Sequence, residues 1–282
     1  MERENAERIR GIRGEQRGAV DGERWTAAVS GEKHGRTAAV VLAGGRGSRM
    51  KSQVPKQYID LCGRPLIYYA LKAFEDSSVI DEIVLVAGRG EAERVRRGIV
   101  EKYGFSKVAA VTEGGAERYD SVNAGLACLA GGAVSASGGE RAVSVSMADY
   151  VLIHDGARPL VDQDIIARCA DGAEKWGACV AAVPVKDTIK VAGGDGFAAE
   201  TPNRSTLWAV QTPQAFSLSL IRSAYGVLMA SEENRRGITD DAMVAERFLG
   251  AKVRLVEGSY SNIKVTTPED IAVAEALLRM RR

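Results

Sequence analysis

Short apolar runs alternate with amphipathic segments along most of this chain of 282 residues, and this alternation constrains the fold more than any other feature. The runs AAVVLAG, EIVLVAG and KVAAV are followed in turn by the helix-like stretches PLIYYALKAFED, EAERVRRGIVEKYG and ERYDSVNAGLACLA. Such alternation is typical of repeated βα units and predicts a mostly parallel sheet. Because the runs are almost continuously apolar, the strands should be buried on both faces. We therefore expect an α/β fold in which helices cover both faces of the sheet.

Residues 1–36 differ in composition from the rest of the chain. They combine mixed charge with many glycines and have no apolar stripe long enough to pack, which predicts a disordered N-terminal tail. The segment lacks the apolar centre of a secretory signal, and its seven acidic residues argue against an organelle transit peptide. We expect residues 37–282 to form one large domain.

A projecting β-arm is predicted over about residues 186–208. The stretch KDTIKVAGGDGFAAETPNRSTLWAVQTP has neither helical periodicity nor a long buried run, and it alternates like a hairpin around a Gly-Gly-Asp-Gly turn. Its apolar faces fit a contact between the two copies of a homodimer, whereas the alternative is a merely exposed ribbon. We expect the next helix to lie in PQAFSLSLIRSAYGVLMAS.

Charge and cysteine content argue against several classes of protein. The formal net charge is +1, so no global basic field favours nucleic acid or a membrane surface as a partner. No apolar run approaches the roughly 18 to 20 residues of a membrane span. The four cysteines are scattered without a CxxC pair, which argues against a zinc site or a disulfide framework and fits a reducing cytoplasm.

A glycine-rich loop, LAGGRGSRMKSQVPKQY, follows the first apolar run. Glycines after a buried strand let backbone N–H groups approach the oxygens of a ligand such as phosphate. Met50 stands where a dinucleotide loop needs its third small residue, and also where a P-loop needs glycine before Lys51, so both loops are excluded. The remaining cations, Arg49 and Lys56, suit a triphosphate better than a nicotinamide cofactor. The alternative is a tight turn with solvated charges.

The loop is the first of seven ordered blocks, and the six that follow it are GGAERYDSVNAGL, HDGARPLV, PVKDTIK, LWAVQTPQAF, TDDAMVAE and NIKVTTPED. Together they resemble the sugar-phosphate nucleotidyltransferases, and PKQY in the loop is similar to the cytidylyltransferases of methylerythritol phosphate and of pentitol phosphates. The resemblance covers residues 37–282. It implies a Rossmann-like nucleotidyltransferase fold and transfer of CMP from CTP to 2-C-methyl-D-erythritol 4-phosphate, with release of pyrophosphate, in the non-mevalonate isoprenoid pathway.

Two alternatives stay open beside this function. A ribitol-5-phosphate cytidylyltransferase shares the loop and the PKQ block, although HDGARP and LWAVQTPQ favour the isoprenoid enzyme. A nucleotide-binding module without catalysis is the other alternative. The presence of Arg49, Lys56 and Lys264 together argues against such a module, because binding alone does not demand three cations around one phosphorus.

The implied reaction needs no general base, because a phosphate oxygen of the acceptor is already ionised when it attacks the α-phosphorus of CTP. Catalysis then depends on positioning and charge neutralisation. The chain has only two histidines, which agrees with this expectation. By resemblance, Arg49 and Lys56 stabilise the reacting phosphorus, and Lys264 places the incoming phosphate beside it.

The resemblance also implies which residues bind the nucleotide. They are the backbone of Ala43, Gly44, Gly45 and Gly47, together with Gly115, Ser121 and Asp155. Ser121 has a helix cap as its alternative role. Many members of the family carry aspartate at the position of Ala116, so a cytosine contact there must use the backbone.

The acceptor substrate, a polyol phosphate, is implied to contact Asp155, Arg158, Thr188, Arg204, Thr212 and Lys264. Thr188 and the catalytic Arg204 lie on the arm and reach the substrate of the neighbouring subunit. Asp155 is also a weak ligand candidate for Mg²⁺, the implied cofactor, which is held mainly by the CTP phosphates. The alternative for Asp155 is a surface ion pair with Arg158. We interpret His154 as a packed strand residue.

Overall fold

The structure is a computed structural model that describes residues 35–44, 55–129 and 147–281. The chain divides into two units, Met1–Lys33 and His34–Arg282, and the sheet and helices belong to the second unit. Apart from Gly35 and Arg36, the predicted tail lies outside the described residues.

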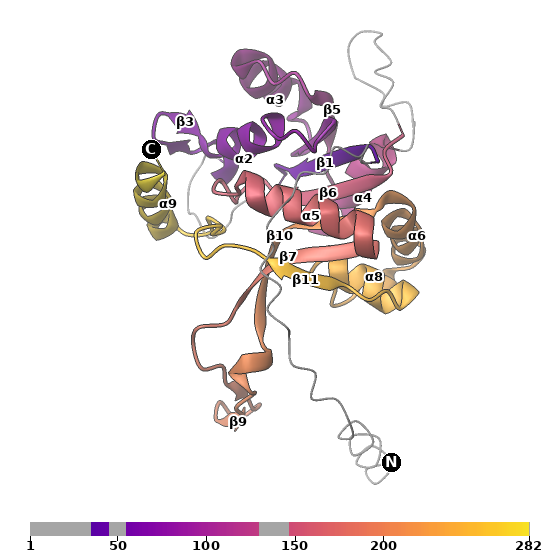
Figure 1. Cartoon of the computed structure of the whole chain (residues 1–282), viewed down its shortest axis with the longest axis vertical. Helices are drawn as coiled ribbons and strands as arrows, with labels where there is room; N and C mark the ends of the chain where they lie inside the picture. The colour runs from indigo at the N-terminus through magenta and orange to yellow at the C-terminus, as the bar shows by residue number, and fades with distance from the viewer. Residues whose placement is uncertain (1–34, 45–54, 130–146, 282) are drawn as a thin grey trace. The chain divides into compact units, whose positions relative to one another are not determined.

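A seven-stranded sheet forms the centre of this unit, with the strand order β11-β7-β10-β6-β1-β4-β5 (Figure 1). Only β10 runs antiparallel to its neighbours, and the other pairs are parallel. This arrangement confirms the predicted mostly parallel sheet. The strands are β1 (Thr37–Leu42), β4 (Glu82–Ala87), β5 (Val108–Glu113), β6 (Tyr150–Asp155), β7 (Ala178–Pro184), β10 (Trp208–Ser217) and β11 (Arg254–Glu257).

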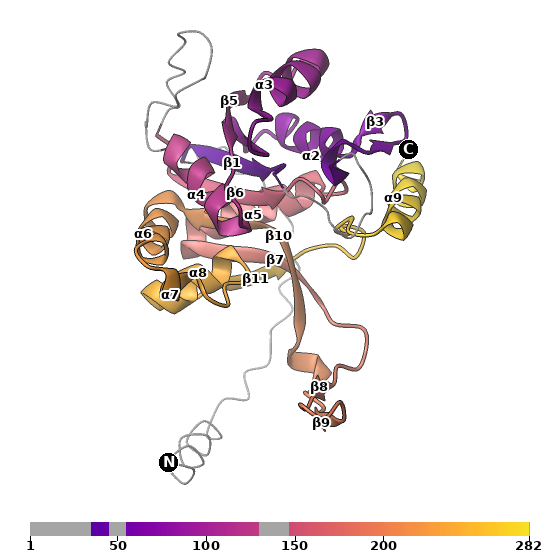
Figure 2. The same cartoon turned by 180° about the vertical axis from the view of Figure 1, so that it is seen from behind.

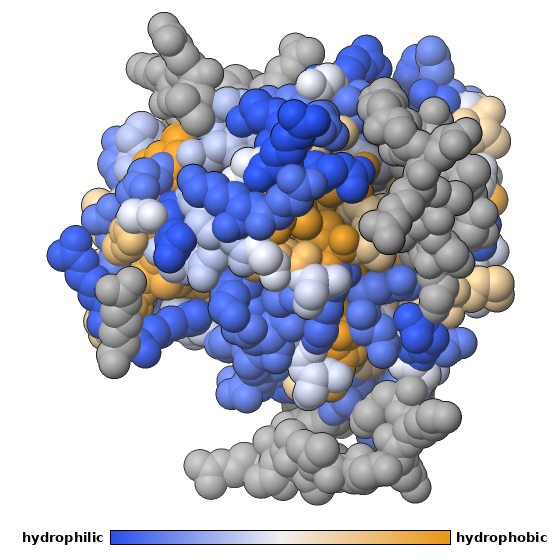
Figure 3. All heavy atoms as spheres, turned by 90° about the horizontal axis from the view of Figure 1, so that it is seen from above, coloured by the Kyte–Doolittle hydropathy of each residue, from blue (hydrophilic) through white to orange (hydrophobic). Residues whose placement is uncertain are grey.

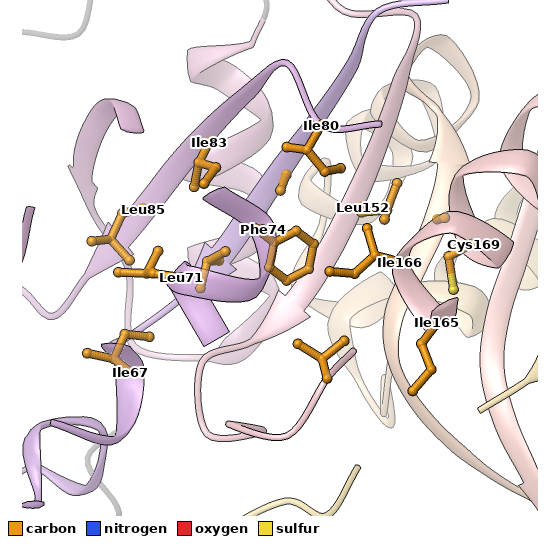
Figure 4. Packing of buried hydrophobic residues seen from close by; sticks show 14 of the residues in the cluster. Ile67, Leu71, Phe74, Ile80, Ile83, Leu85, Leu152, Ile165, Ile166 and Cys169 are labelled. Carbon is orange, nitrogen blue, oxygen red and sulfur yellow. The ribbon is translucent and has the colours of Figure 1, made fainter. Parts of the chain in front are cut away.

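Helices cover both faces of the sheet, as expected. Alternate residues of β1 show why, because Val41 packs in one apolar cluster with α2 and α5, whereas Val40 packs in the other with α4, α6 and α8. Figure 4 shows Phe74 of α2 beside Ile166 of α5 in the first cluster. The helices are α2 (Leu66–Glu75), α3 (Ala92–Val95), the π-helix η3 (Arg96–Glu101), α4 (Arg118–Cys128), α5 (Gln163–Trp176), α6 (Leu218–Met229), α7 (Glu232–Arg235), α8 (Asp241–Leu249) and α9 (Pro268–Met280).

Local sequence fixes where the main helices begin and end. The side chain of Asp162 accepts a hydrogen bond from the backbone of Ile165 at 2.9 Å and caps α5, which ends at Gly177 with φ of 74°. Asp240 caps α8 in the same way, accepting from Met243 at 2.9 Å. These caps fix the residues at which the two helices begin.

The segment Trp208–Ser217 corrects one expectation. The stretch PQAFS, expected at the start of a helix, belongs to β10, and α6 begins only at Leu218. Proline removes a ladder donor and argues against a central strand. The register of β10 against β7 shifts between Val210 and Gln214, and Pro213 lies in this irregular stretch, where no regular ladder bond is required.

The arm leaves the sheet after β7 and returns to it at β10, as Figures 1 and 2 show. It contains the two-stranded antiparallel ribbon of β8 (Val191–Ala192) and β9 (Ala198–Glu200) and the 3₁₀ turn η4 (Arg204–Thr206). Phe197 at its turn is 75% exposed, so an apolar side chain is presented to solvent there. The projecting arm therefore agrees with the predicted fold.

The face seen from above carries mainly hydrophilic side chains, and its apolar ones gather in small patches (Figure 3). Among the described residues, no helix combines the length and the apolar character that crossing a membrane requires.

Candidate active site

A cavity of about 520 Å³ lies where four neighbouring strands of the sheet end. Its lining follows the carboxyl ends of β1, β4, β5 and β6, the edge at which open parallel sheets bind ligands. The lining residues are Leu42, Gly44, Pro55, Lys56, Gln57, Gly88, Arg89, Glu91, Gly115, Ala116, Glu117, Arg118, Ser121, Asp155, Ala157 and Lys264.

Two lysines from distant parts of the chain meet at this cavity. Lys56 begins the 3₁₀ turn η2 (Lys56–Tyr58), and its Nζ donates a hydrogen bond to the backbone carbonyl of Val265 at 3.3 Å. The next side chain, that of Gln57, donates to the backbone oxygen of Ala43 and so ties this turn to the end of β1. Lys264 adjoins Val265, so both ammonium groups belong to one small region.

Asp155, the last residue of β6, holds two of the cavity's cations. Its Oδ2 lies 2.6 Å from Nζ of Lys264, and its Oδ1 accepts from Nε of Arg118 at 3.2 Å. Burial raises the pKa of Asp155, but the charges of Arg118 and Lys264 outweigh this effect and hold the pKa well below its usual range. The carboxylate is therefore a fixed negative charge at neutral pH.

Arg118 is a cavity residue that the sequence interpretation missed, although it stands inside the GGAERYDSV block. It is the first residue of α4. A cation at a helix N-terminus opposes the helix dipole, so an arginine there signals that carboxylates are nearby. Its Nη1 and Nη2 donate to Oδ1 and Oδ2 of Asp241 at 2.8 and 2.7 Å.

A chain of hydrogen bonds lies behind Asp155. The backbone N–H of Asp155 donates to Oγ1 of Thr212 at 3.0 Å, which leaves the threonine proton free to reach Nδ1 of His154 at 3.1 Å. Nε2 of His154 then carries the ring proton and donates to the carbonyl of Arg158 at 3.1 Å. Burial lowers the pKa of His154 to about 4, so the ring is neutral. His154 is buried within the strand, as we interpreted it.

Thr212 and Arg158 therefore support the cavity from behind. Neither is among its described lining residues, and Thr212 is only 4% exposed. The guanidinium of Arg158 donates to the backbone carbonyl of Asn262 at 2.8 Å, just before the segment that carries Lys264. Both residues were expected at the acceptor site. Thr212 contacts Asp155, which lines the cavity, and Arg158 contacts Asn262, which lies two residues before Lys264.

Gly115 and Ser121 line the cavity after β5, as the sequence suggested. A Cβ atom at Gly115 would overlap the side chain of Asp120, so the backbone can lie this close only with glycine. The hydroxyl of Ser121 donates to the carbonyl of Glu117 at 3.3 Å within α4, whose N-terminus is capped instead by a box of Glu117 and Asp120.

Arg89 is a second cavity cation that the sequence interpretation passed over. It follows β4 in an exposed turn and lines the cavity. It makes no hydrogen bond or ion pair with any other residue in the ranges that the structure describes. By contrast, Arg118 and Lys264 each face a carboxylate. No motif marks Arg89, so only the three-dimensional lining identifies it.

Two of the expected residues, Thr188 and Arg204, are not among the residues that line this cavity. Thr188 and Arg204 are exposed on the arm, where Arg204 donates to the backbone carbonyl of Lys186 at 2.7 Å. Gly45, Gly47 and Arg49 lie outside the described residues, whereas Ala43 and Gly44 are described. Ala43 extends the ladder by donating to the carbonyl of Val86 at 2.7 Å, and Gly44 lines the cavity.

The donor set does not fit a metal ion held by the protein alone. Within the described ranges, no cluster of three or more His, Cys, Asp or Glu side chains is placed to bind one. Both oxygens of Asp155 already face cations, which leaves this carboxylate unsuited as the core of a resident metal site.

Known proteins share both the sequence and the fold. The family model for 2-C-methyl-D-erythritol 4-phosphate cytidylyltransferase matches residues 37–280. The enzyme of that name from Lachnospira eligens is 49% identical over 242 residues, which cover 86% of this chain and 98% of the relative. The one from Alkaliphilus oremlandii is 45% identical over 251 residues, with 89% and 98% covered.

Solved structures agree with these relatives. The 4-diphosphocytidyl-2C-methyl-D-erythritol synthase of Anaerococcus prevotii superimposes with a TM-score of 0.69 at 32% identity, covering 87% of this chain and 99% of that one. The 2-C-methyl-D-erythritol 4-phosphate cytidylyltransferase of Thermus thermophilus gives 0.63 at 30% identity, with 85% and 98% covered.

Proposed function

The chain belongs to the 2-C-methyl-D-erythritol 4-phosphate cytidylyltransferase family, and from this premise we propose how its own residues perform the reaction. It is a cytidylyltransferase of isoprenoid biosynthesis that transfers CMP from CTP to 2-C-methyl-D-erythritol 4-phosphate. The products are 4-diphosphocytidyl-2-C-methyl-D-erythritol and pyrophosphate. The family's relatives and structures favour this acceptor over ribitol 5-phosphate.

The observation that carries the proposed roles is the meeting of Lys56, Lys264 and Asp155 at one sheet edge. An ionised phosphate oxygen of the acceptor forms a bond to the α-phosphorus of CTP, and the bond to the bridging oxygen breaks. Pyrophosphate leaves with that electron pair, so no proton has to be transferred in the step. Catalysis then requires positive charge at fixed positions around the phosphorus.

Lys56 stabilises the charge that develops on the α-phosphate, and Arg49 shares this role. Lys264 holds the incoming phosphate of the acceptor beside the α-phosphorus. Asp155 prepares Lys264 for this task, because the ion pair at 2.6 Å fixes the ammonium before substrate arrives. An ammonium has three donors, so Lys264 can keep Asp155 and still bind phosphate oxygens.

The cytidine half of CTP occupies the part of the cavity after β4 and β5. The backbone at Gly44 and Gly115 approaches the nucleotide, with Ser121 at the base or ribose. Arg89, which faces no described carboxylate, attracts the triphosphate at the rim of the same cavity. Arg158 and Thr212 support the acceptor site through the contacts behind Asp155.

Magnesium arrives with the nucleotide under this proposal. Mg²⁺ binds phosphate oxygens and keeps several waters, so a triphosphate can carry it without a protein cage. Asp155 is at most a weak additional contact, because Arg118 and Lys264 already occupy its two oxygens.

The arm completes the neighbouring subunit's site in a homodimer. Supporting this, Thr188 and Arg204 are exposed and stand outside their own chain's cavity, and apolar Phe197 and Val191 are exposed on the arm. Residues 37–282 act as the cytidylyltransferase domain, with the arm at about 186–208. The scattered cysteines support a reducing, cytoplasmic location.

The test of the activity is turnover across acceptors. Pyrophosphate release should be measured with CTP and Mg²⁺ and either 2-C-methyl-D-erythritol 4-phosphate or ribitol 5-phosphate. We expect rapid release with the first acceptor alone. Equal or faster release with ribitol 5-phosphate would reverse the choice of substrate, and no release with either would favour a nucleotide-binding module.

A further inference from the structure

Asp241 is a fully buried carboxylate whose contacts lead toward the cavity that it does not itself line. It opens α8, and both of its oxygens are paired with Arg118 at 2.8 and 2.7 Å. The hydroxyl of Tyr225 adds a third bond at 2.6 Å to Oδ1. A buried charge is tolerated only when it is paired and hydrogen-bonded in this way.

Arg118 divides its donors between two carboxylates. Nη1 and Nη2 both donate to Asp241 as a bidentate pair (a fork), and Nε alone reaches Asp155 at 3.2 Å. Burial lowers the pKa of Arg118, but Asp241 and Asp155 outweigh it and raise the pKa well above its usual value. The fork is the stronger of the two geometries, so it decides how the guanidinium is turned.

The backbone that carries Asp241 is fixed to the centre of the sheet. Oε1 of Gln214, on β10, accepts from the backbone N–H groups of Asp241 and Ala242, both at 3.0 Å. Nε2 of Gln214 donates to Oδ2 of the capping Asp240 at 2.9 Å. Thr212, whose hydroxyl accepts from the backbone of Asp155, lies on the same strand. Residues of β10 therefore bind the backbone of both Asp241 and Asp155.

We propose that Asp241 is a positioning residue of the active site, which acts through Arg118 to orient Asp155 and to leave Oδ2 of that carboxylate for Lys264. The inference rests on the proposed role of Lys264 beside the reacting phosphorus. Asp241 stands in the TDDAMVAE block but received no role from the sequence, and it does not line the cavity, because its effect reaches Lys264 through three ion pairs.

Removing the carboxylate of Asp241 would change the contacts of Arg118 and, through them, the position of Lys264. Without the Asp241 carboxylate, Arg118 would be a largely enclosed cation with one remaining anion, Asp155. A guanidinium forks onto a carboxylate when it can, and the fork would occupy both oxygens of Asp155. Lys264, now 2.6 Å from Oδ2, would then have to share that oxygen with the guanidinium, and its ammonium would move from the position that the incoming phosphate requires.

The first test is Asp241→Asn in the full chain, because the amide keeps the shape and removes the charge. A displacement of about 1 Å at a reacting group can cost up to about 100-fold in rate, so we expect kcat to fall by at least about 10-fold. The KM for CTP should stay within about threefold, since the cytidine contacts lie elsewhere in the cavity.

Tyr225→Phe is the matched control for lost stability. It removes a bond to the same buried carboxylate but leaves the fork between Asp241 and Arg118 intact. We expect a lower Tm with kcat within about twofold of wild type. If Tyr225→Phe lost as much kcat as Asp241→Asn, a general loosening would explain both, and the proposal would be overturned.

A double-mutant cycle tests the route through Arg118. Lysine at position 118 has one charged head and cannot join Asp241 to Asp155, so Arg118→Lys should also lower kcat. In that background, adding Asp241→Asn should change kcat by less than about twofold. A full, additive loss would show that Asp241 acts by another path and would overturn the inference.

Arg118→Lys also carries the test if Asp241→Asn does not fold. A folded Arg118→Lys enzyme with wild-type kcat would overturn the proposal, because the link between the two carboxylates would then be unnecessary. Wild-type enzyme that releases no pyrophosphate in the same assay would instead contradict the proposed function, so the two failures are distinguishable.

Discussion

Nζ of Lys56 donates a hydrogen bond to the backbone carbonyl of Val265 at 3.3 Å. This contact joins the turn after the glycine loop to the segment that carries Lys264, whose own Nζ lies 2.6 Å from Asp155. The two lysines are thus brought to one cavity by backbone geometry rather than by closeness in sequence. Convergent positive charge is what transfer of a nucleotidyl group requires.

Replacing either lysine should reduce catalysis while the fold persists. Losing one preorganised charge typically costs about 100- to 1,000-fold in kcat, so we expect Lys56→Ala and Lys264→Ala to lose that much. Lys252→Ala, which removes an exposed lysine away from the cavity lining, is the control. Pyrophosphate release and thermal unfolding should be measured on all three, and near-native kcat in either active-site variant would contradict the assigned roles.

Arg89→Gln should weaken CTP binding and leave chemistry unchanged. A partly exposed cation on a phosphate contributes about 1 kcal/mol, so the KM for CTP should rise about fivefold with kcat preserved. Arg97→Gln makes the same change of charge at a residue that pairs with Glu93 at 2.6 Å outside the cavity, and it should have no effect.

Cytidine separates the phosphate contact of Arg89 from a base contact. If Arg89 binds the triphosphate, Arg89→Gln should leave the affinity for cytidine unchanged, and the salt dependence of CTP binding should decrease. Equal weakening of CTP and cytidine would place this guanidinium at the base.

Arg204→Ala should impair use of the acceptor rather than of CTP. Because the arm stands apart from its own cavity, we expect a higher KM for 2-C-methyl-D-erythritol 4-phosphate and nearly unchanged CTP binding. A selective loss of CTP affinity would show that the arm is wrongly assigned.

Mixed dimers test whether the arm serves the partner. Co-expression of differently tagged Arg204→Ala and Lys264→Ala chains should yield heterodimers in which one of the two sites is intact. At an acceptor concentration too low for the Arg204→Ala homodimer to turn over, and with about half of the dimers mixed, turnover per subunit should be about a quarter of the wild-type value. The dimers can be counted by native mass spectrometry. Heterodimers without activity would mean that Arg204 acts within its own chain.

The free energy of unfolding should decrease as the pH is lowered through a range set by His154. Burial lowers the pKa of this histidine from 6.5 to about 4. Between these two pH values, His154 is protonated in the unfolded chain but stays neutral in the folded chain. The contribution of neutral His154 to the free energy of unfolding is therefore fully present above pH 6.5. It is lost as the pH falls towards 4, and the loss amounts to at most about 3 kcal/mol. Asp155 adds its own loss only at lower pH, because its pKa is depressed from an ordinary value near 3.8.

Urea unfolding at pH 7.0, 5.5 and 4.5 measures this effect. His154→Gln should give a flatter dependence than wild type, and His34 is present in both proteins, so its contribution cancels. Parallel slopes for the two proteins would show that His154 is protonated in the folded chain.

Removing magnesium should abolish turnover without changing the fold. EDTA should stop pyrophosphate release, and MgCl₂ should restore it. Because the described residues form no cluster for a resident ion, the Tm of the free enzyme should change by less than about 1 °C in EDTA. A drop of several degrees would reveal a structural metal.

The sequence predicted the parallel part of the sheet because burial on both faces leaves an unmistakable apolar run. β1, for example, reads TAAVVL, and its buried residues face both helical layers. β10 was missed because Pro213 interrupts its pattern, and its place between β6 and β7 depends on pairing with strands far away in sequence. Long-range pairing leaves no local periodicity to recognise.

The residues of the candidate site that stand in a recognisable sequence motif could be predicted. Lys56, Asp155 and Lys264 each stand in a recognisable block, and all three line the cavity. Arg118 and Asp241 were passed over because their pairing exists only in three dimensions. The one local signal was the position of Arg118 at a helix N-terminus, where a cation needs a nearby anion.

The central claim is that cations from distant segments surround one phosphorus, and the distances in a crystal structure with bound CTP and Mg²⁺ test it most directly. We expect the charged nitrogens of Arg49, Lys56 and Lys264 to lie within about 3 to 4 Å of oxygens around the α-phosphorus, or of an acceptor phosphate beside it. A complex in which Lys56 and Lys264 point into separate regions of solvent, more than about 8 Å from that phosphorus, would contradict the account.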